Sequence, residues 1–150
     1  MAILPSEQQL KIKFSTQPSF THKIFDIIDE LLDIVVMDKE KRREFIIALG
    51  EALDNAIVHG NKMSKDKFVE VECMVSPSQI TCLVKDEGDG FDYRLITSQP
   101  LDEFSPQNLM QRAVKGKIGG LGIALIRKCT DEVTFSNKGN QVSFTKYLKT

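Results

Sequence analysis

The chain has 150 residues, of which 41% are hydrophobic and 27% are charged, and its 20 basic and 21 acidic side chains leave a net charge of -1. This length fits a single domain with one core, and the composition excludes a disordered chain, a collagen-like repeat and a coiled coil. A nearly neutral chain has no overall field that attracts nucleic acid or an anionic membrane. We therefore expect one domain over residues 1–150, with no direct nucleic-acid partner and no membrane partner.

We expect neither a membrane span nor a signal peptide, because no apolar run approaches about 18 residues and residues 1–11 lack the basic head and apolar stretch of a signal peptide. We therefore expect a cytoplasmic protein. Cys73, Cys82 and Cys129 lie in apolar segments and lack the C-x-x-C spacing of a metal or redox site. Their expected state is the buried free thiol.

The first part of the chain predicts one strand and two helices. Residues 10–14 (LKIKF) alternate between apolar and polar side chains, as in a half-buried strand. Pro18 opens a segment with apolar residues three or four apart, which is typical of an amphipathic helix, and its apolar end at 31–37 is expected to pack in the core. Asp38 is the expected N-cap of a second helix, which runs to about Val58 and stops at His59-Gly60-Asn61.

The middle of the chain predicts a hairpin and then a long loop. Residues 68–75 alternate, Ser76-Pro77-Ser78 favours a turn, and residues 80–84 form a second short apolar strand. Residues 93–117 have only patchy periodicity and contain two prolines, so we expect a lid-like loop with one short helix near 108–114.

The last part of the chain predicts a helix and a second hairpin. Residues 119–122 (GGLG) lead into an apolar helix, and strands are expected at 132–136 and 142–148. Adjacent hairpins favour a mixed, mostly antiparallel sheet with the helices on one face. The expected fold class is therefore α/β of the α+β type, a two-layer sandwich.

Glu51, Asn55 and His59 follow one another at intervals of four residues and so form one polar line on the second predicted helix. Asn55 has apolar neighbours, so its carboxamide lies near the core and needs a partner. A carboxylate and a carboxamide one turn apart can bind a hard cation or its waters, and the carboxylate can accept a proton. Taken alone, a solvated helix face is the simpler interpretation.

The segment Asp86-Glu87-Gly88-Asp89-Gly90 follows the strand at 80–84. Its glycines permit a tight turn with positive φ and let a flat ligand approach the backbone, while Asp86 can accept a hydrogen bond from an amine. A calcium loop is excluded because Gly88 occupies a position that needs an oxygen ligand. Taken alone, a plain turn explains this motif equally well.

Lys115 and Lys117 precede the glycine-rich start of the helix after residue 120. Free backbone N–H groups at the positive end of a helix dipole outline an anion site. A P-loop is excluded because G-K-[ST] is missing, and a Rossmann motif is excluded because a long loop rather than a strand comes first.

In this order the three motifs resemble the N, G1 and G2 boxes of the Bergerat-fold ATPases, the superfamily of gyrase, histidine kinases and the mismatch-repair ATPases. The short length, the pattern E-A-x-x-N-A-x-x-H-G-N and the helix G-G-L-G-I-A-L-I resemble the anti-sigma-factor serine protein kinases over about residues 12–148. The resemblance implies that ATP and Mg²⁺ bind, with Asn55 coordinating the Mg²⁺ between the phosphates. It also implies that Glu51 orients or deprotonates the substrate hydroxyl and that Asp86 binds the adenine amine.

The remaining implied roles belong to the glycine-rich segments and to one lysine. Lys117 falls where related sequences often carry an Arg that reaches the terminal phosphate, and it supplies charge without the guanidinium fork. Gly88 and Gly90 would shape the turn below the base. The implied phosphate-binding loop consists of Gly119, Gly120, Leu121 and Gly122.

The resemblance implies an ATP-dependent serine protein kinase that regulates transcription. It would bind a sigma factor as an anti-sigma factor, phosphorylate a small anti-anti-sigma (STAS-type) antagonist protein, and form a homodimer. The alternative is a non-catalytic switch module that binds ATP or ADP and changes its grip on a protein partner. A detached histidine-kinase catalytic domain is a third interpretation.

Overall fold

The computed structural model describes residues 7–35, 37–90, 121–136 and 138–148. Its elements are β1 (Gln8–Ser15), α1 (Pro18–Asp33), α2 (Lys39–Asp54), the π-helix η1 (Asn55–Gly60), β2 (Phe68–Val75), β3 (Gln79–Lys85), α5 (Leu121–Cys129), β4 (Glu132–Phe135) and β5 (Gln141–Tyr147). None of these helices is long and apolar enough to cross a membrane.

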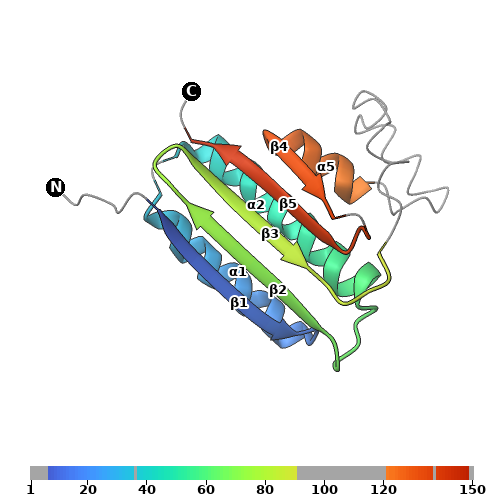
Figure 1. Ribbon diagram of the computed structural model, residues 1–150. Coiled ribbons are helices and arrows are strands. Elements are labelled where there is room, and N and C mark those ends of the chain that lie inside the picture. The colour runs from blue at the N-terminus through green and yellow to red at the C-terminus, as the bar shows by residue number, and fades with distance from the viewer. Residues whose placement is uncertain (1–6, 36, 91–120, 137, 149–150) are drawn as a thin grey trace.

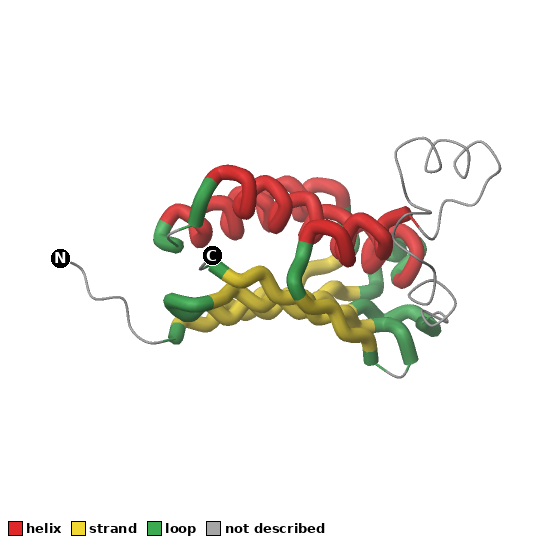
Figure 2. Tube along the Cα trace, turned by 90° about the horizontal axis from the view of Figure 1, so that it is seen from above, coloured by secondary structure: helices red, strands yellow, loops and turns green. Residues whose placement is uncertain are grey.

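The described strands form one five-stranded sheet in the order β1-β2-β3-β5-β4 (Figure 1). Each neighbouring pair is antiparallel, whereas the sequence allowed for a mixed sheet. Figure 2 shows that the helices form a single layer on one face of this sheet. The predicted two-layer α+β fold is confirmed.

The sheet has one buried face and one solvated face because its strands alternate apolar and polar residues. In β2, Val69, Val71 and Cys73 are buried, while Glu70 and Glu72 between them are only partly covered. The helix layer covers the apolar face. Packing on one face with water on the other is common in antiparallel sheets and explains this alternation.

The two long helices begin where the sequence predicts. α1 starts at Pro18, a position where a missing N–H costs no intrahelical hydrogen bond, and it buries Ile28 and Leu32. α2 starts after Asp38, whose carboxylate accepts a hydrogen bond from the Lys41 N–H at 2.8 Å. This capping bond satisfies one of the N–H groups that a helix start leaves unpaired.

The predicted core packing of the apolar residues at 31–37 is confirmed except at Ile34, which is 44% exposed, while Val36 lies outside the described residues. Leu32 and Val35 are buried, and Leu31 and Met37 pack against the core. The predicted strands and the last helix lie close to their observed bounds, and 68–75 coincides with β2. The predicted loop over 93–117, with its short helix, lies outside the described residues.

The prediction of three free thiols is wrong for two of them. Cys73 of β2 and Cys82 of β3 are joined by a disulfide, while Cys129 is free and buried. The register of the hairpin places Cys73 directly opposite Cys82, with a Cα–Cα distance of 4.3 Å, so the side chains meet on the buried face.

A buried lysine joins three elements under the end of α5. Lys146 of β5 is 6% exposed and forms an ion pair with Glu44 of α2. Its Nζ also donates a hydrogen bond to the main-chain oxygen of Cys129 at 2.9 Å, at the negative end of the α5 dipole. These contacts fix β5, α2 and the C-terminus of α5 to one another.

We expect Glu44→Gln to lower the free energy of unfolding by about 2 kcal/mol, because the Lys146 ammonium would stay buried without its carboxylate. Urea unfolding at pH 7 measures this loss. Glu40→Gln on the same helix is the matched control: its carboxylate pairs with Arg43 on the surface, so the expected loss is below about 1 kcal/mol. Equal losses in the two variants would contradict an anchoring role for the buried pair.

Candidate functional site

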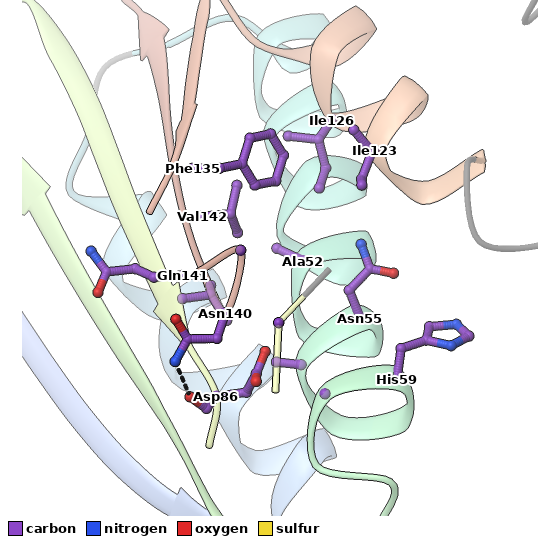
Figure 3. Close-up of a pocket in the computed structure, with 15 residues that line it drawn as sticks. Ala52, Asn55, His59, Asp86, Ile123, Ile126, Phe135, Asn140, Gln141 and Val142 are labelled. Carbon is purple, nitrogen blue, oxygen red and sulfur yellow. Dashed lines mark hydrogen bonds between the residues drawn. The ribbon is translucent and has the colours of Figure 1, made fainter. Parts of the chain in front are cut away.

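A cavity of about 290 Å³ lies between the sheet and the helix layer, where α2, η1 and α5 face β3 and the β4–β5 hairpin (Figure 3). Its volume is close to the lower end of the range for small-molecule sites. It is lined by Ala52, Asn55, Ala56, His59, Gly60, Val84, Asp86, Gly90, Ile123, Ile126, Phe135, Gly139, Asn140, Gln141 and Val142. Apolar walls with a few polar groups suit a flat ligand that carries one or two hydrogen-bonding positions.

Asp86 lies at one end of this cavity, directly after β3, in close contact with the end of η1. A Cβ atom at Gly60 would lie 2.3 Å from the Asp86 Cγ, and one at Gly88 would lie 2.4 Å from the Gly60 oxygen. The Gly88 N–H donates a hydrogen bond to Asp86 Oδ1 at 2.7 Å. Only glycine at these two positions allows the helix end and the turn to approach so closely.

The predicted positive φ in this turn is confirmed at Gly90, where φ is +83°. A Cβ atom there would lie 1.7 Å from the main-chain oxygen of Lys138, in the segment between β4 and β5. The turn after β3 and the β4–β5 connection are therefore packed backbone against backbone. Gly90 and Gly139, on the two sides of this contact, both line the cavity.

The predicted second helix is correct in extent but wrong in type over its last turns. The α-helix ends at Asp54, and Asn55–Gly60 form a π-helix in which the Asn61 N–H bonds to the Ala56 oxygen, five residues back, at 2.8 Å. A π turn holds more residues than an α turn, so each residue after Asn55 is rotated less far about the axis than it would be in an α-helix. Short π segments of this kind are frequent at functional sites.

Glu51 and Asn55 lie against the start of α5. A Cβ atom at Gly122 would lie 2.9 Å from Glu51 Oε2 and 3.3 Å from both polar atoms of the Asn55 carboxamide. Two segments that are far apart in the sequence, the polar line on α2 and the glycine-rich start of α5, therefore meet at the edge of the cavity. A larger side chain at position 122 would separate them.

Both carboxylates of the site are partly buried, and burial changes their titration. Burial raises the pKa of Asp86 because it penalises the charged form, while a backbone N–H and the charges of Lys138 and Lys67 lower it. Burial likewise raises the pKa of Glu51, and the neighbouring Asp54 carboxylate raises it further. Perturbed carboxylates of this kind, gathered around a cavity, are typical of functional sites.

The structure brings together part of the predicted site. Asn55, Asp86 and Gly90 line the cavity, Gly88 lies beneath Asp86, and Glu51 contacts Gly122. Leu121 is the first residue of α5, and three predicted phosphate-binding residues lie outside the described part of the chain, namely Lys117, Gly119 and Gly120.

Several residues of the site were not predicted as such. The sequence places His59 on the polar line without a site role and assigns Gly60 and Asn61 only to a helix stop, yet His59 and Gly60 line the cavity and Asn61 is fully buried. Asn140 and Phe135 come from the β4–β5 hairpin, which carries no recognisable motif. The one sequence signal for Asn61 is an asparagine directly after a glycine at a helix end. A carboxamide that becomes buried there needs hydrogen-bond partners.

This helix-covered antiparallel sheet, with its cavity between two glycine-containing turns, has the architecture of an ATPase domain. A family model described as a histidine kinase-like ATPase domain matches residues 14–146, and the chain belongs to this family. It is similar to the serine-protein kinase RsbW of Bacillus subtilis (strain 168), at 29% identity over 140 residues, 93% of this chain and 85% of that protein. Similarity to RsbW of Staphylococcus aureus (strain JH9) is 32% over 107 residues, 69% of this chain and 64% of that protein. The predicted resemblance to Bergerat-fold serine protein kinases is confirmed.

We expect Asp86→Asn to stabilise the folded chain at pH 7, because it removes a carboxylate whose charged form burial disfavours. The folded-state pKa of Asp86 lies above its unfolded value, so the wild type regains stability as the pH falls through the folded-state pKa. The advantage of the variant should therefore shrink towards about pH 3, below the ordinary pKa of an aspartate.

Urea unfolding between about pH 7 and pH 3 measures this difference. Asp89→Asn, at an exposed position of the same turn, is the matched control. If Asp86→Asn is less stable than the wild type at pH 7, the prediction is wrong. That result would show that interactions in the folded protein offset the cost of burying the Asp86 charge.

Proposed function

We propose that this protein is an ATP-dependent serine protein kinase that also binds a sigma factor and phosphorylates a small anti-anti-sigma antagonist of STAS type. The observation that carries the kinase proposal is the meeting of Glu51 and Asn55 with the start of α5, at the edge of the cavity that ends at Asp86. The names of the similar proteins, serine-protein kinases, support it. The sigma factor and the antagonist rest on the sequence resemblance.

In this proposal the apolar walls of the cavity bury the adenine and Asp86 accepts a hydrogen bond from its amine. The phosphates extend towards the N-terminus of α5, where free N–H groups and the helix dipole favour an anion. Lys117 contributes positive charge, and the phosphate contacts fall to Gly119, Gly120, Leu121 and Gly122. Gly88 and Gly90 shape the turn beneath the base.

The Asn55 side chain fits the Mg²⁺ role because a carboxamide oxygen is a hard ligand and Mg²⁺ needs few protein ligands when phosphates complete its shell. It is half-buried, and its polar atoms would lie 3.3 Å from a Cβ atom at Gly122, so the glycine lets it approach the start of α5 closely. When bound, Mg²⁺ neutralises charge on the phosphates.

Glu51 is the proposed proton acceptor. Its raised pKa makes it a better base than an exposed carboxylate, and phosphoryl transfer demands placement more than basicity. The serine oxygen of the antagonist bonds to the γ-phosphorus as the bond to the bridging oxygen of ADP breaks. The hydroxyl proton passes to Glu51.

We expect Glu51→Gln to keep ATP affinity and to lower serine phosphorylation by at least about 100-fold, because the variant cannot accept the proton. Asn55→Ala should abolish transfer from Mg-ATP, because it removes the proposed metal ligand. Phosphoserine on the purified antagonist reports transfer, and calorimetry reports ATP binding.

Unchanged transfer in Glu51→Gln would remove Glu51 from the proton step. Wild-type protein that binds ATP but yields no phosphoserine would refute the kinase. If nucleotide then still changed the affinity for the partner, the non-catalytic switch module would be the correct description.

The homodimer implied by the resemblance is supported by an apolar stripe on α1. Phe20 and Ile27 of α1 and Ile34, the residue that caps its C-terminus, are 39%, 42% and 44% exposed and follow each other at seven-residue intervals, which places them on one side of the helix. Figure 1 shows α1 beneath β1, an edge strand of the sheet. A second copy of the chain that covers this stripe would remove it from water.

We expect Ile27→Glu to weaken the dimer by at least about tenfold in dissociation constant, because a charge replaces an apolar contact at the centre of the stripe. Sedimentation measured over a range of protein concentrations tests this. Asp26→Lys, at an exposed position of α1 about 100° round the helix axis from Ile27, is the control for a change in charge alone. A wild type that stays monomeric at high concentration would contradict the dimer.

A further inference from the structure

A single peptide group of the Asp86 turn is held by two asparagine side chains that come from different parts of the fold. Asn140 Nδ2 donates a hydrogen bond to the Asp86 main-chain oxygen at 3.0 Å, drawn as a dashed line in Figure 3. The next N–H, that of Glu87, donates to Asn61 Oδ1 at 2.7 Å. Because this oxygen and this N–H belong to one planar peptide unit, the two bonds fix its orientation from both ends.

Asn61 is fully buried and follows directly after η1. Besides accepting from the Glu87 N–H, its side chain donates from Nδ2 to the Phe68 oxygen at the start of β2, at 2.9 Å. A buried carboxamide is costly unless its polar atoms have partners, and here both ends of the group are engaged. Asn61 therefore connects the end of the helix, the start of β2 and the Asp86 turn.

Asn140 holds Asp86 from the opposite side, within the β4–β5 connection. Its main-chain oxygen accepts a hydrogen bond from the Asp86 N–H at 2.9 Å, and its side chain accepts from Ser136 Oγ at 3.2 Å. Both backbone polar groups of Asp86 are thus bonded to Asn140. With the backbone held on both sides, the direction of the Asp86 Cα–Cβ bond is fixed.

Asp86 Oδ1 accepts a hydrogen bond from the Gly88 N–H, which leaves Oδ2 to accept a hydrogen bond from a ligand. We propose that Asn61 and Asn140 are positioning residues that aim the Asp86 carboxylate and so select a purine with a 6-amino group over one with a 6-oxo group. A fixed carboxylate accepts a hydrogen bond from the amine and repels the oxo oxygen. This inference rests on the proposed binding of ATP.

The test compares ATP with inosine triphosphate, in which an oxo group replaces the 6-amine, by calorimetry on the full chain. The wild type should prefer ATP by about tenfold or more. Asn61→Ala and Asn140→Ala should each lower this preference by at least about threefold through weaker ATP binding. Because both side chains act on one peptide group, their effects in the double variant should be less than additive.

Thr16→Val is the matched control. The Thr16 hydroxyl is 1% exposed and contacts the oxygens of Ser64 and Lys67, each at 2.6 Å, in the loop between Asn61 and β2. The variant loses buried hydrogen bonding in this loop without touching the Asp86 turn. It should lose stability and keep the preference for ATP.

An unchanged preference in Asn140→Ala, or an equal fall in Thr16→Val, would overturn the inference. If Asn61→Ala does not fold, Asn140→Ala decides the matter alone, since Asn140 lies at a partly exposed turn. A wild type that binds neither nucleotide would refute the proposed function. A wild type that binds both equally well would refute base selection while leaving the kinase proposal intact.

Discussion

The close approach of η1 to the Asp86 turn is the constraint on which the rest of the site depends. Gly60 leaves no room for a side chain between helix and carboxylate, and Asn61 then bonds to the same turn. One short helix therefore carries Asn55 at one end and meets Asp86 at the other. The separation between the two ends of the cavity is set by a rigid element instead of by a flexible loop, which favours a precise fit to one ligand.

The surrounding fold compensates for features that are unfavourable at the site. Glu51 and Asp86 are half-buried carboxylates of the site, and Lys62 and Met63, in the loop that follows η1, are non-glycine residues with positive φ. They are tolerated because the apolar core beneath α1 and α2 is continuous and because Lys146 anchors α5 to its neighbours. Stability is thus gained away from the cavity and reduced around it, a common balance in binding proteins.

The sequence predicts those parts of this architecture that have a local cause. Alternation predicts β2, and the capping carboxylate of Asp38 predicts the start of α2. The π turns at Asn55 are not predictable in this way, because residue propensities do not encode the wider spacing and distant packing selects it. Asn61 and Asn140 were missed for a related reason: their partners are main-chain groups far away in the sequence. The disulfide, by contrast, was within reach, since a hairpin that pairs Val75 with Ile80 also pairs Cys73 with Cys82.

That disulfide lies on the covered face of the sheet, and both of its sulfur-bearing residues are fully buried. Exchange with a dissolved thiol requires direct attack on a sulfur atom, so a reductant has no path to this bond while the helix layer is in place. Cleavage must wait for β2 and β3 to become uncovered. The rate of disulfide reduction in a mild thiol buffer therefore reports how often the domain interior opens transiently. A nucleotide that stabilises the folded domain would slow this reduction.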